Sequence, residues 1–429
     1  MDRKNCFILK GDIAYSGSDR ELLTYENHYL ICMDGRIEGI YSKIPDSFEN
    51  IPVRDCSGQI IIPGMTDLHL HASQYTFRGL GMDLELLDWL STYTFPEEAK
   101  YKDITYAKKA YEIFTEDLKR SYTTRACVYA TLHQAGTLEL MEQLEKSGLI
   151  TYVGKVDMDR NADSALCYLS TQELLRETKE WVQTSKKRFQ RTFPMITPRF
   201  IPTCTDELMN GLGTLSATYK VPVQSHLSEN HAEIAWVNEL VPMAESYGQA
   251  YDDFHMLGSL EQPAIMAHCV YLGEDERRLL REKGTYIAHC PDSNMNIASG
   301  IAPVRAFLNE GLCVAIGTDV AGGATLSMPR AVTLAIQASK MYWRLVDPSM
   351  MYLSFAEAFY MATRSGGSYF GKTGAFEQGY DADILVIDDS AIRSLVKYPL
   401  SLRVERLMYF FDQARLKDKY VAGRKIEFD

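Results

Sequence analysis

The chain has 429 residues and a formal net charge of −12 at pH 7, from 45 Lys and Arg against 57 Asp and Glu. A protein that holds phosphates electrostatically needs a basic face, so this charge argues against nucleic acid and against an anionic membrane surface as partners. With 46% hydrophobic and 24% charged residues, the composition is typical of a globular protein and excludes disorder as a global description.

Targeting signals and cysteine usage indicate a cellular compartment. The N-terminal residues MDRKNCFILKGD include no apolar segment of signal-peptide length, and no run of eighteen apolar residues follows. The nine cysteines are scattered and form no C-x-x-C pair, which favours reduced thiols over a disulfide framework or a Cys-rich zinc site. We therefore expect a cytoplasmic protein.

The two ends of the chain have the pattern of β-strands. The first sixty residues contain short alternating apolar runs punctuated by Gly and Asp, which predict antiparallel hairpins. Similar runs return only near the C-terminus, at 381–390 and 417–428. Since neither end has enough strands to bury a stable face alone, we predict that they pair. The expected product is a small β-sandwich domain built from residues 1–62 and 372–429.

The middle of the chain has a different rhythm. Short apolar runs alternate with long amphipathic stretches such as 104–121, which predicts a parallel sheet covered by helices. There are eight strand candidates, at 60–71, 125–132, 150–158, 193–202, 221–229, 263–271, 285–292 and 313–320. Eight is the number that closes a (β/α)8 barrel, so we predict an α/β fold with a TIM-like barrel over residues 63–371.

The strongest local motif is LHLH, which ends the first barrel strand. His69 and His71 are two residues apart, so strand alternation points both imidazoles to one face. Neutral imidazole is a preferred zinc ligand, and two of them on one strand form a metal half-site. The alternative is a pair of hydrogen-bonded histidines in a loop.

Other metal-competent side chains recur at the ends of later strands. His226, His268, His289 and Asp319 lie near the C-terminal ends of their strand candidates, and barrel enzymes place their active sites at this C-terminal rim. This recurrence favours the metal interpretation. We expect three other histidines, at 28, 133 and 255, to be exposed or satisfied by hydrogen bonds. For His289 a packing role and a substrate contact stay equally open.

One competing motif is rejected. Residues 231–233, HAE, fit the H-x-E of cytidine-type zinc deaminases, but that mechanism needs a following P-C-x-x-C, which the chain lacks. We expect HAE to open the helix after the fifth strand.

Longer strings identify a family. They are PGMTDLHLHASQY at 63–75, SHLSEN at 225–230, MAHCVYL at 266–272, IAHCPDSN at 287–294, IGTDVAGG at 316–323 and GAFEQGYDADILVID at 374–388. Over essentially its whole length the chain resembles the amidohydrolase superfamily of metal-dependent hydrolases, in the branch that includes the triazine hydrolases. HASQY, the segment DLELLDWLSTYTFPEE at 83–98 and PRF at 198–200 are similar to guanine deaminases.

The resemblance implies a metal site. His69, His71, His226 and Asp319 would bind one divalent ion per chain, with zinc preferred on ligand type and iron as the alternative. Such an ion lowers the pKa of a bound water molecule to about 7, so that a nucleophile exists at neutral pH.

The resemblance also implies catalytic roles beside the metal. Glu229, three residues after His226, would carry the water proton to a ring nitrogen of the substrate. His268 would orient the nucleophile and stabilise charge in the tetrahedral intermediate, and Asp319 would both bind metal and accept a hydrogen bond from the attacking water. The alternative for Glu229 is an exposed loop carboxylate.

Substrate recognition follows from the same resemblance. Guanine has a carbonyl acceptor next to a ring donor on one edge, which suits a side-chain amide and a guanidinium. Gln74 and Arg199 match the positions with these roles, and Phe200 would supply an aromatic wall. The alternative for Arg199 is a surface salt bridge. The aromatic residues of the 89–95 segment are expected in a lid or in the core, with the core favoured by their spacing.

The activity implied by the resemblance is hydrolytic deamination of guanine to xanthine and ammonia, in purine catabolism and salvage. In that reaction a metal-activated water would attack carbon 2. The resemblance also implies a homodimer. An alternative is deamination of an oxidised guanine, a pterin or a triazine. A more remote alternative is a catalytically inactive scaffold, which would have no need of the metal ligands.

Overall fold

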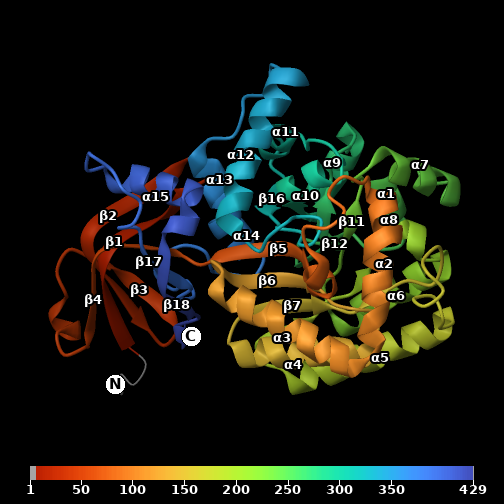
Figure 1. Cartoon of the computed structure of the whole chain (residues 1–429), viewed down its shortest axis with the longest axis horizontal. Helices are drawn as coiled ribbons and strands as arrows, with labels where there is room; N and C mark the ends of the chain where they lie inside the picture. Colours follow the sequence, from red (N-terminus) through yellow and green to blue (C-terminus); the bar gives the residue numbers. More distant parts are fainter. Residues whose placement is uncertain (1–5, 429) are drawn as a thin grey trace.

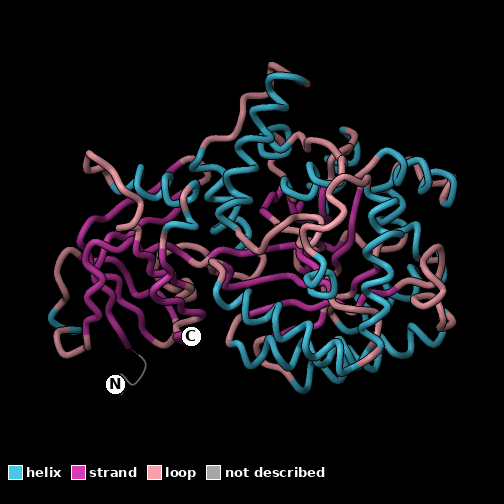
Figure 2. Tube along the Cα trace, in the orientation of Figure 1, coloured by secondary structure: helices cyan, strands magenta, loops and turns pink. Residues whose placement is uncertain are grey.

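The structure is a computed structural model that describes residues 6–428. Figure 1 shows a β-rich part made from the two ends of the chain, in red and dark blue, beside a larger part. In Figure 2 the strands of the larger part lie inside a shell of helices. Within residues 6–428, no helix combines the length and apolar character needed to cross a bilayer.

The smaller part contains one seven-stranded sheet in the order β19-β18-β17-β4-β1-β2-β3. Its strands are β1 (Cys6–Ser18), β2 (Glu21–Met33), β3 (Arg36–Tyr41), β4 (Val53–Pro63), β17 (Ile384–Asp388), β18 (Arg415–Val421) and β19 (Arg424–Ile426). β17 pairs antiparallel with β4, so the two chain ends meet inside the sheet, as predicted. The β1–β2, β2–β3 and β18–β19 pairs are antiparallel hairpins, whereas β1 and β4 pair in parallel.

The two faces of this sheet bury different cores. Ile61 of β4 packs in a core confined to the smaller part, whereas Ile60 and Ile62 join the main core of the molecule. Alternation along the strand causes this division. Helices α13 (Phe355–Tyr360) and α15 (Leu400–Tyr409) pack against β1 and β2. The described strands of this part thus form one sheet covered by helices, and the second sheet that the predicted β-sandwich requires is not confirmed among residues 6–428.

The larger part contains two four-stranded parallel sheets, β5-β6-β7-β9 and β11-β14-β15-β16, with shorter pairs beside them. Its strands are β5 (Met65–His71), β6 (Thr123–Tyr129), β7 (Ile150–Gly154), β8 (Val156–Asp157), β9 (Thr192–Pro194), β10 (Thr197–Pro198), β11 (Gln224–Leu227), β12 (Gly258–Ser259), β13 (Gln262–Pro263), β14 (Ile265–His268), β15 (Tyr286–His289) and β16 (Cys313–Ile316). Each of the eight predicted segments contains a strand. The segment 60–71 is divided between β4 and β5.

Backbone hydrogen bonds join the two parallel sheets beyond their ladders. Asp319 N–H donates to the His69 carbonyl at 2.7 Å, and His71 N–H donates to the Val320 carbonyl at 2.8 Å. On the opposite side, Ile196 N–H donates to the Pro222 carbonyl at 2.8 Å. The strand ends that carry the candidate ligands are therefore tied to one another by main chain.

The helices lie between these strands. They are α1 (Leu86–Trp89), α2 (Phe95–Ala99), α3 (Ile104–Arg120), α4 (Gln134–Ser147), α5 (Thr171–Arg188), α6 (Asp206–Tyr219), α7 (His231–Leu240), α8 (Tyr247–Asp253), α9 (Glu274–Lys283), α10 (Pro291–Asn296), α11 (Val304–Asn309), α12 (Met328–Leu345) and α14 (Gly366–Ser368), with α13 and α15 as given above. The predicted helix at 104–121 is confirmed as α3. Asp103 caps it by accepting from the Thr105 N–H, and its buried face includes Tyr111, Phe114 and Leu118.

Candidate functional site

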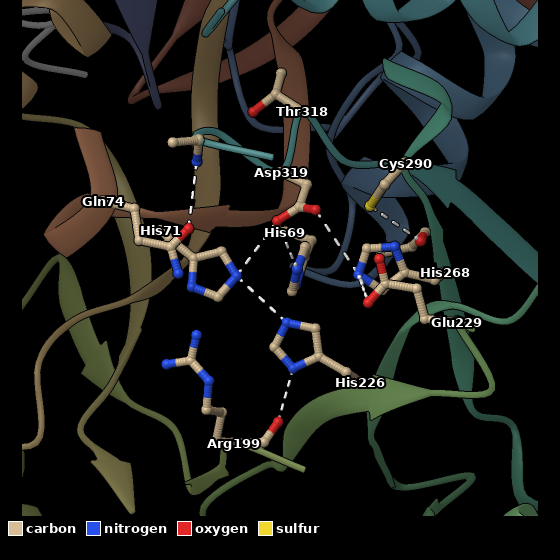
Figure 3. A network of polar contacts seen from close by, with 12 residues as sticks. His69, His71, Gln74, Arg199, His226, Glu229, His268, Cys290, Thr318 and Asp319 are labelled. Carbon is tan, nitrogen blue, oxygen red and sulfur yellow. Dashed lines mark hydrogen bonds and ion pairs between the residues drawn. The ribbon is translucent and has the colours of Figure 1, made fainter. Parts of the chain in front are cut away.

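The strand ends bring the candidate metal ligands to one place. His69 and His71 come from β5, His226 comes from β11, His268 ends β14, and Asp319 lies three residues after β16. Figure 3 shows their side chains converging. Their backbone turns sharply here, because Asp319 and His268 adopt positive φ angles of 47° and 70°, a conformation that non-glycine residues reach mainly where surrounding structure enforces it.

The four predicted metal ligands contact one another directly. Asp319 Oδ1 lies 3.1 Å from His69 Nε2 and 3.3 Å from His71 Nε2. His226 Nε2 lies 3.3 Å from His71 Nε2. His69, His71 and Asp319 form one group of atoms close enough to share an ion, and His69, His226 and His268 form another. The predicted set is therefore assembled, with His268 beside it.

Hydrogen bonding shows which nitrogens can serve as ligands. His226 Nδ1 lies 2.7 Å from the Arg199 carbonyl, which can only accept, so Nδ1 carries the proton and Nε2 presents a lone pair to His71. Neither ring nitrogen of His69 makes a hydrogen bond of good geometry, although the ring is fully buried and its Nε2 lies 3.1 Å from Asp319 Oδ1. Buried lone pairs that face one another and a carboxylate are costly without a cation among them. The residues thus fit a divalent metal ion.

Electrostatics favour the same donor set. Burial lowers the pKa of His69 to about 4, and burial together with the neighbouring imidazoles lowers the pKa of His226 well below its usual value. Burial opposes ionisation of Asp319, but contacts from His69 and His71 outweigh it and hold the pKa of this carboxyl well below its usual value. At neutral pH the imidazoles of His69 and His226 are therefore neutral and Asp319 is ionised, which are the forms that bind metal.

A carboxyl–imidazole pair lies on the other side of the cluster. Glu229 Oε2 is 3.4 Å from His268 Nε2, which is 3.7 Å from Asp319 Oδ2. Burial raises the pKa of Glu229 to about 7. For His268 burial favours the neutral form, but the charges of Glu229 and Asp319 outweigh it and raise its pKa. A carboxyl with a pKa near neutrality can both accept and release a proton under working conditions.

Of these groups, all but His69 line one pocket. Its lining residues are His71, Gln74, Leu86, Trp89, Leu90, Arg199, Phe200, His226, Glu229, His268, Ile297 and Asp319. Most of its wall away from the cluster is apolar or aromatic, which suits a planar ring. Every predicted substrate-binding residue, namely Gln74, Arg199, Phe200 and Glu229, is in this wall.

Gln74 and Arg199 share a partner that the sequence interpretation missed. Glu98 of α2 accepts from Gln74 Nε2 at 3.0 Å and from Arg199 Nη1 at 2.7 Å, and all three side chains are buried. Arg199 is therefore no surface salt bridge. Glu98 closes the 83–98 segment that carried the family resemblance, but nothing in its spacing indicates its partners, which lie 24 and 101 residues away.

Two further supporting residues also escaped the sequence interpretation. Asn294 Oδ1 lies 2.9 Å from His268 Nδ1, and Ser299 Oγ donates to Glu229 Oε1 at 2.8 Å. Both follow His289 within a short loop and helix, and the string HCPDSN was the only signal that pointed there.

The remaining predictions have mixed outcomes. Trp89 lines the pocket, so the 89–95 segment contributes to the site as well as to the core. His289 is buried outside the pocket lining, and burial lowers its pKa to about 3, which favours the packing role. HAE opens α7 at His231, as expected, and Glu233 accepts from the Glu229 N–H at 2.9 Å.

Comparisons with known proteins agree with this geometry. The model of the amidohydrolase family matches residues 60–425. Guanine deaminase of Dictyostelium discoideum is 36% identical over 407 residues, which cover 93% of this chain and 87% of that protein. Guanine deaminase of Escherichia coli (strain K12) is 33% identical over 417 residues, with 94% and 91% covered.

A solved structure extends the likeness to three dimensions. The crystal structure of guanine deaminase from C. acetobutylicum, with guanine bound in its active site, superposes with a TM-score of 0.96 at 44% identity. The match covers 99% of this chain and 100% of that one. Together with the family match, it shows that the larger part has a TIM-barrel fold.

Proposed function

Because the chain belongs to the amidohydrolase family, we propose that it is a metal-dependent hydrolase that deaminates guanine to xanthine and ammonia. Water supplies the oxygen that replaces the 2-amino group, and that group leaves as ammonia.

One observation carries this proposal. A single pocket has the imidazole–carboxylate cluster at its floor, the Glu229–His268 pair on one side and the Gln74–Arg199 pair on the other. In Figure 3 the two pairs lie on opposite sides of the cluster. A purine ring between them would turn its carbonyl edge to the amide and guanidinium donors, and its reacting carbon to the carboxyl.

We assign the metal-binding role to His69, His71, His226 and Asp319, with zinc as the metal. Three neutral imidazoles and one carboxylate form a zinc-type donor set that also accepts iron. When bound, the ion activates a water molecule by lowering its pKa to about 7.

Glu229 would move the protons of the reaction. It would accept a proton from the attacking water as carbon 2 is attacked, and deliver it to the adjacent ring nitrogen, so that the amine can leave after protonation. His268 would hold the water in line and stabilise negative charge on the developing intermediate. Asp319 would accept a hydrogen bond from the same water.

Gln74 and Arg199 would recognise the 6-oxo edge of the base, while Phe200 would pack against the ring. Since these groups contact only one edge, related aminated rings are the competing substrates.

An ammonia-release assay tests this proposal. The metal-loaded protein is incubated with guanine, oxidised guanine, adenine, cytosine, a pterin and a triazine, while metal content is measured on the same sample. We expect guanine to be turned over with the highest kcat/KM. Preference for another ring would replace the substrate, and no ammonia from any ring would favour the inactive scaffold.

Further proposals concern the whole chain. We propose that residues 63–371 form the complete (β/α)8 barrel and that residues 1–62 and 372–429 form the smaller β domain, supported by the pairing of β4 with β17. The homodimer and the cytoplasmic location stay predictions. Light scattering of the purified protein and cell fractionation test them.

A further inference from the structure

A buried carboxylate with no part in metal binding connects the two recognition side chains. Glu98 is 2% exposed and Arg199 is 3% exposed. A buried guanidinium needs a partner, and Glu98 Oε2 at 2.7 Å provides it. Without Glu98 the charge of Arg199 would be uncompensated in a pocket that receives a neutral base.

Glu98 also fixes which atoms of Gln74 face the pocket. An amide can point its oxygen or its nitrogen either way, and a carboxylate can only accept. The hydrogen bond from Gln74 Nε2 to Glu98 Oε1 therefore sets the orientation, with Gln74 Oε1 on the side of the Ala321 N–H at 3.5 Å. The second Nε2 hydrogen stays available for an acceptor on the substrate.

The same carboxylate limits how Arg199 can turn. One terminal nitrogen is held by Glu98, and the guanidinium lies over the Phe95 ring, 5.2 Å from its centroid. Both contacts come from α2, the helix that follows the Trp89 wall of the pocket. The remaining N–H donors of Arg199 are thus kept in a fixed direction.

From these contacts we propose that Glu98 is a positioning residue for substrate specificity. In this role, which rests on the proposed function, Glu98 aligns the donors of Gln74 and Arg199 on the 6-oxo group of the purine. The enzyme would then discriminate between 6-oxopurines and purines without that group largely through Glu98.

The neighbouring carboxylate provides a matched control. Glu97 lies in the same helix and is also buried, but it accepts from Thr76 Oγ1 at 2.7 Å and from Lys100 Nζ at 2.6 Å. Its side chain makes no hydrogen bond or ion pair with Gln74 or Arg199, and it is outside the pocket lining. Loss of Glu97 therefore disturbs the packing of α2 but keeps the carboxylate that contacts Gln74 and Arg199.

The test compares Glu98→Gln, Glu98→Asp and Glu97→Gln with the wild-type protein. Kd is measured for hypoxanthine, which has the 6-oxo group but no 2-amino group, and for purine, which has neither, and kcat and KM are measured for guanine. In Glu98→Gln we expect hypoxanthine affinity to fall by about 100-fold and purine affinity by less than about threefold, because only the 6-oxo group loses its aligned donors. Glu98→Asp keeps the charge and should lose less.

The outcomes separate the explanations. Equal loss of hypoxanthine and purine affinity in both Glu98 variants would show that Glu98 only supports the fold and would overturn the proposal. A selective loss of hypoxanthine affinity in Glu97→Gln as large as that in Glu98→Gln would overturn it as well. If Glu98→Gln does not fold, the Glu98→Asp pattern decides alone. Failure of the wild-type protein to release ammonia from guanine would refute the proposed function instead, and the two Kd values would still decide the role of Glu98.

Discussion

The two sides of the pocket are built differently. The metal-binding side consists of residues at the ends of neighbouring parallel strands, joined by backbone hydrogen bonds such as Asp319 N–H to the His69 carbonyl. The recognition side consists of Gln74, from a 3-10 helix after β5, and Arg199, directly after β10, and a carboxylate on a short α-helix connects them. The first arrangement is fixed by the sheet, whereas the second depends on one buried side chain. Chemistry and specificity should therefore respond to different substitutions.

The largest effect is expected on the metal-binding side. His71→Ala removes an imidazole whose Nε2 lies 3.3 Å from both Asp319 Oδ1 and His226 Nε2. Bound metal and guanine turnover should fall together, with kcat reduced by about 1,000-fold or more. Elemental analysis and ammonia release on one sample check this. Full activity without metal would refute the division between the two sides.

Glu229 lies on the metal-binding side of the pocket but is not one of the proposed metal ligands. Glu229→Gln should keep its metal and lose about 100- to 1,000-fold in kcat. Because the pKa of Glu229 is raised to about 7, its deprotonated form, which accepts the proton, increases as pH rises through this value. The wild-type kcat/KM should therefore increase with pH and level off at about pH 7. If bound metal stabilises the carboxylate, the increase should level off at a somewhat lower pH. If Glu229→Gln showed the same increase of kcat/KM with pH, the increase would belong to another group.

The strands of the larger part and the metal-binding side could be predicted from the sequence. The eight strand positions and the rim histidines followed from alternation and from the count of apolar runs, because a ligand at a strand end needs only local pattern to be recognised. Glu98 could not be derived, since its side chain contacts Gln74 and Arg199, which lie 24 and 101 residues away in the sequence. The parallel β1–β4 pair was missed for a similar reason, because consecutive strands suggest hairpins by default.

On the recognition side, Arg199→Met should leave metal content unchanged and lower kcat/KM for guanine by about 100-fold, since a site built to hydrogen-bond a carbonyl loses that donor. The guanine assay with elemental analysis measures both. Loss of metal in this variant would mean that Arg199, whose carbonyl holds His226, also supports the cluster through its side chain.

The smallest effect is expected at the pocket wall. Phe200→Leu keeps an apolar surface and removes only the stacking face, so KM for guanine should rise by about threefold to tenfold with kcat nearly unchanged. Steady-state kinetics on guanine provide the values. A large fall in kcat would show that Phe200 helps to align the reacting carbon.

The central claim is that this pocket replaces the 2-amino group of guanine with oxygen from water. The most direct measurement is mass spectrometry of the purine formed from guanine in water enriched in oxygen-18, with ammonia quantified in parallel. We predict xanthine that carries a single heavy oxygen at carbon 2, formed in equal amount to ammonia. Unaltered guanine, or a product without the heavy oxygen, would contradict the claim.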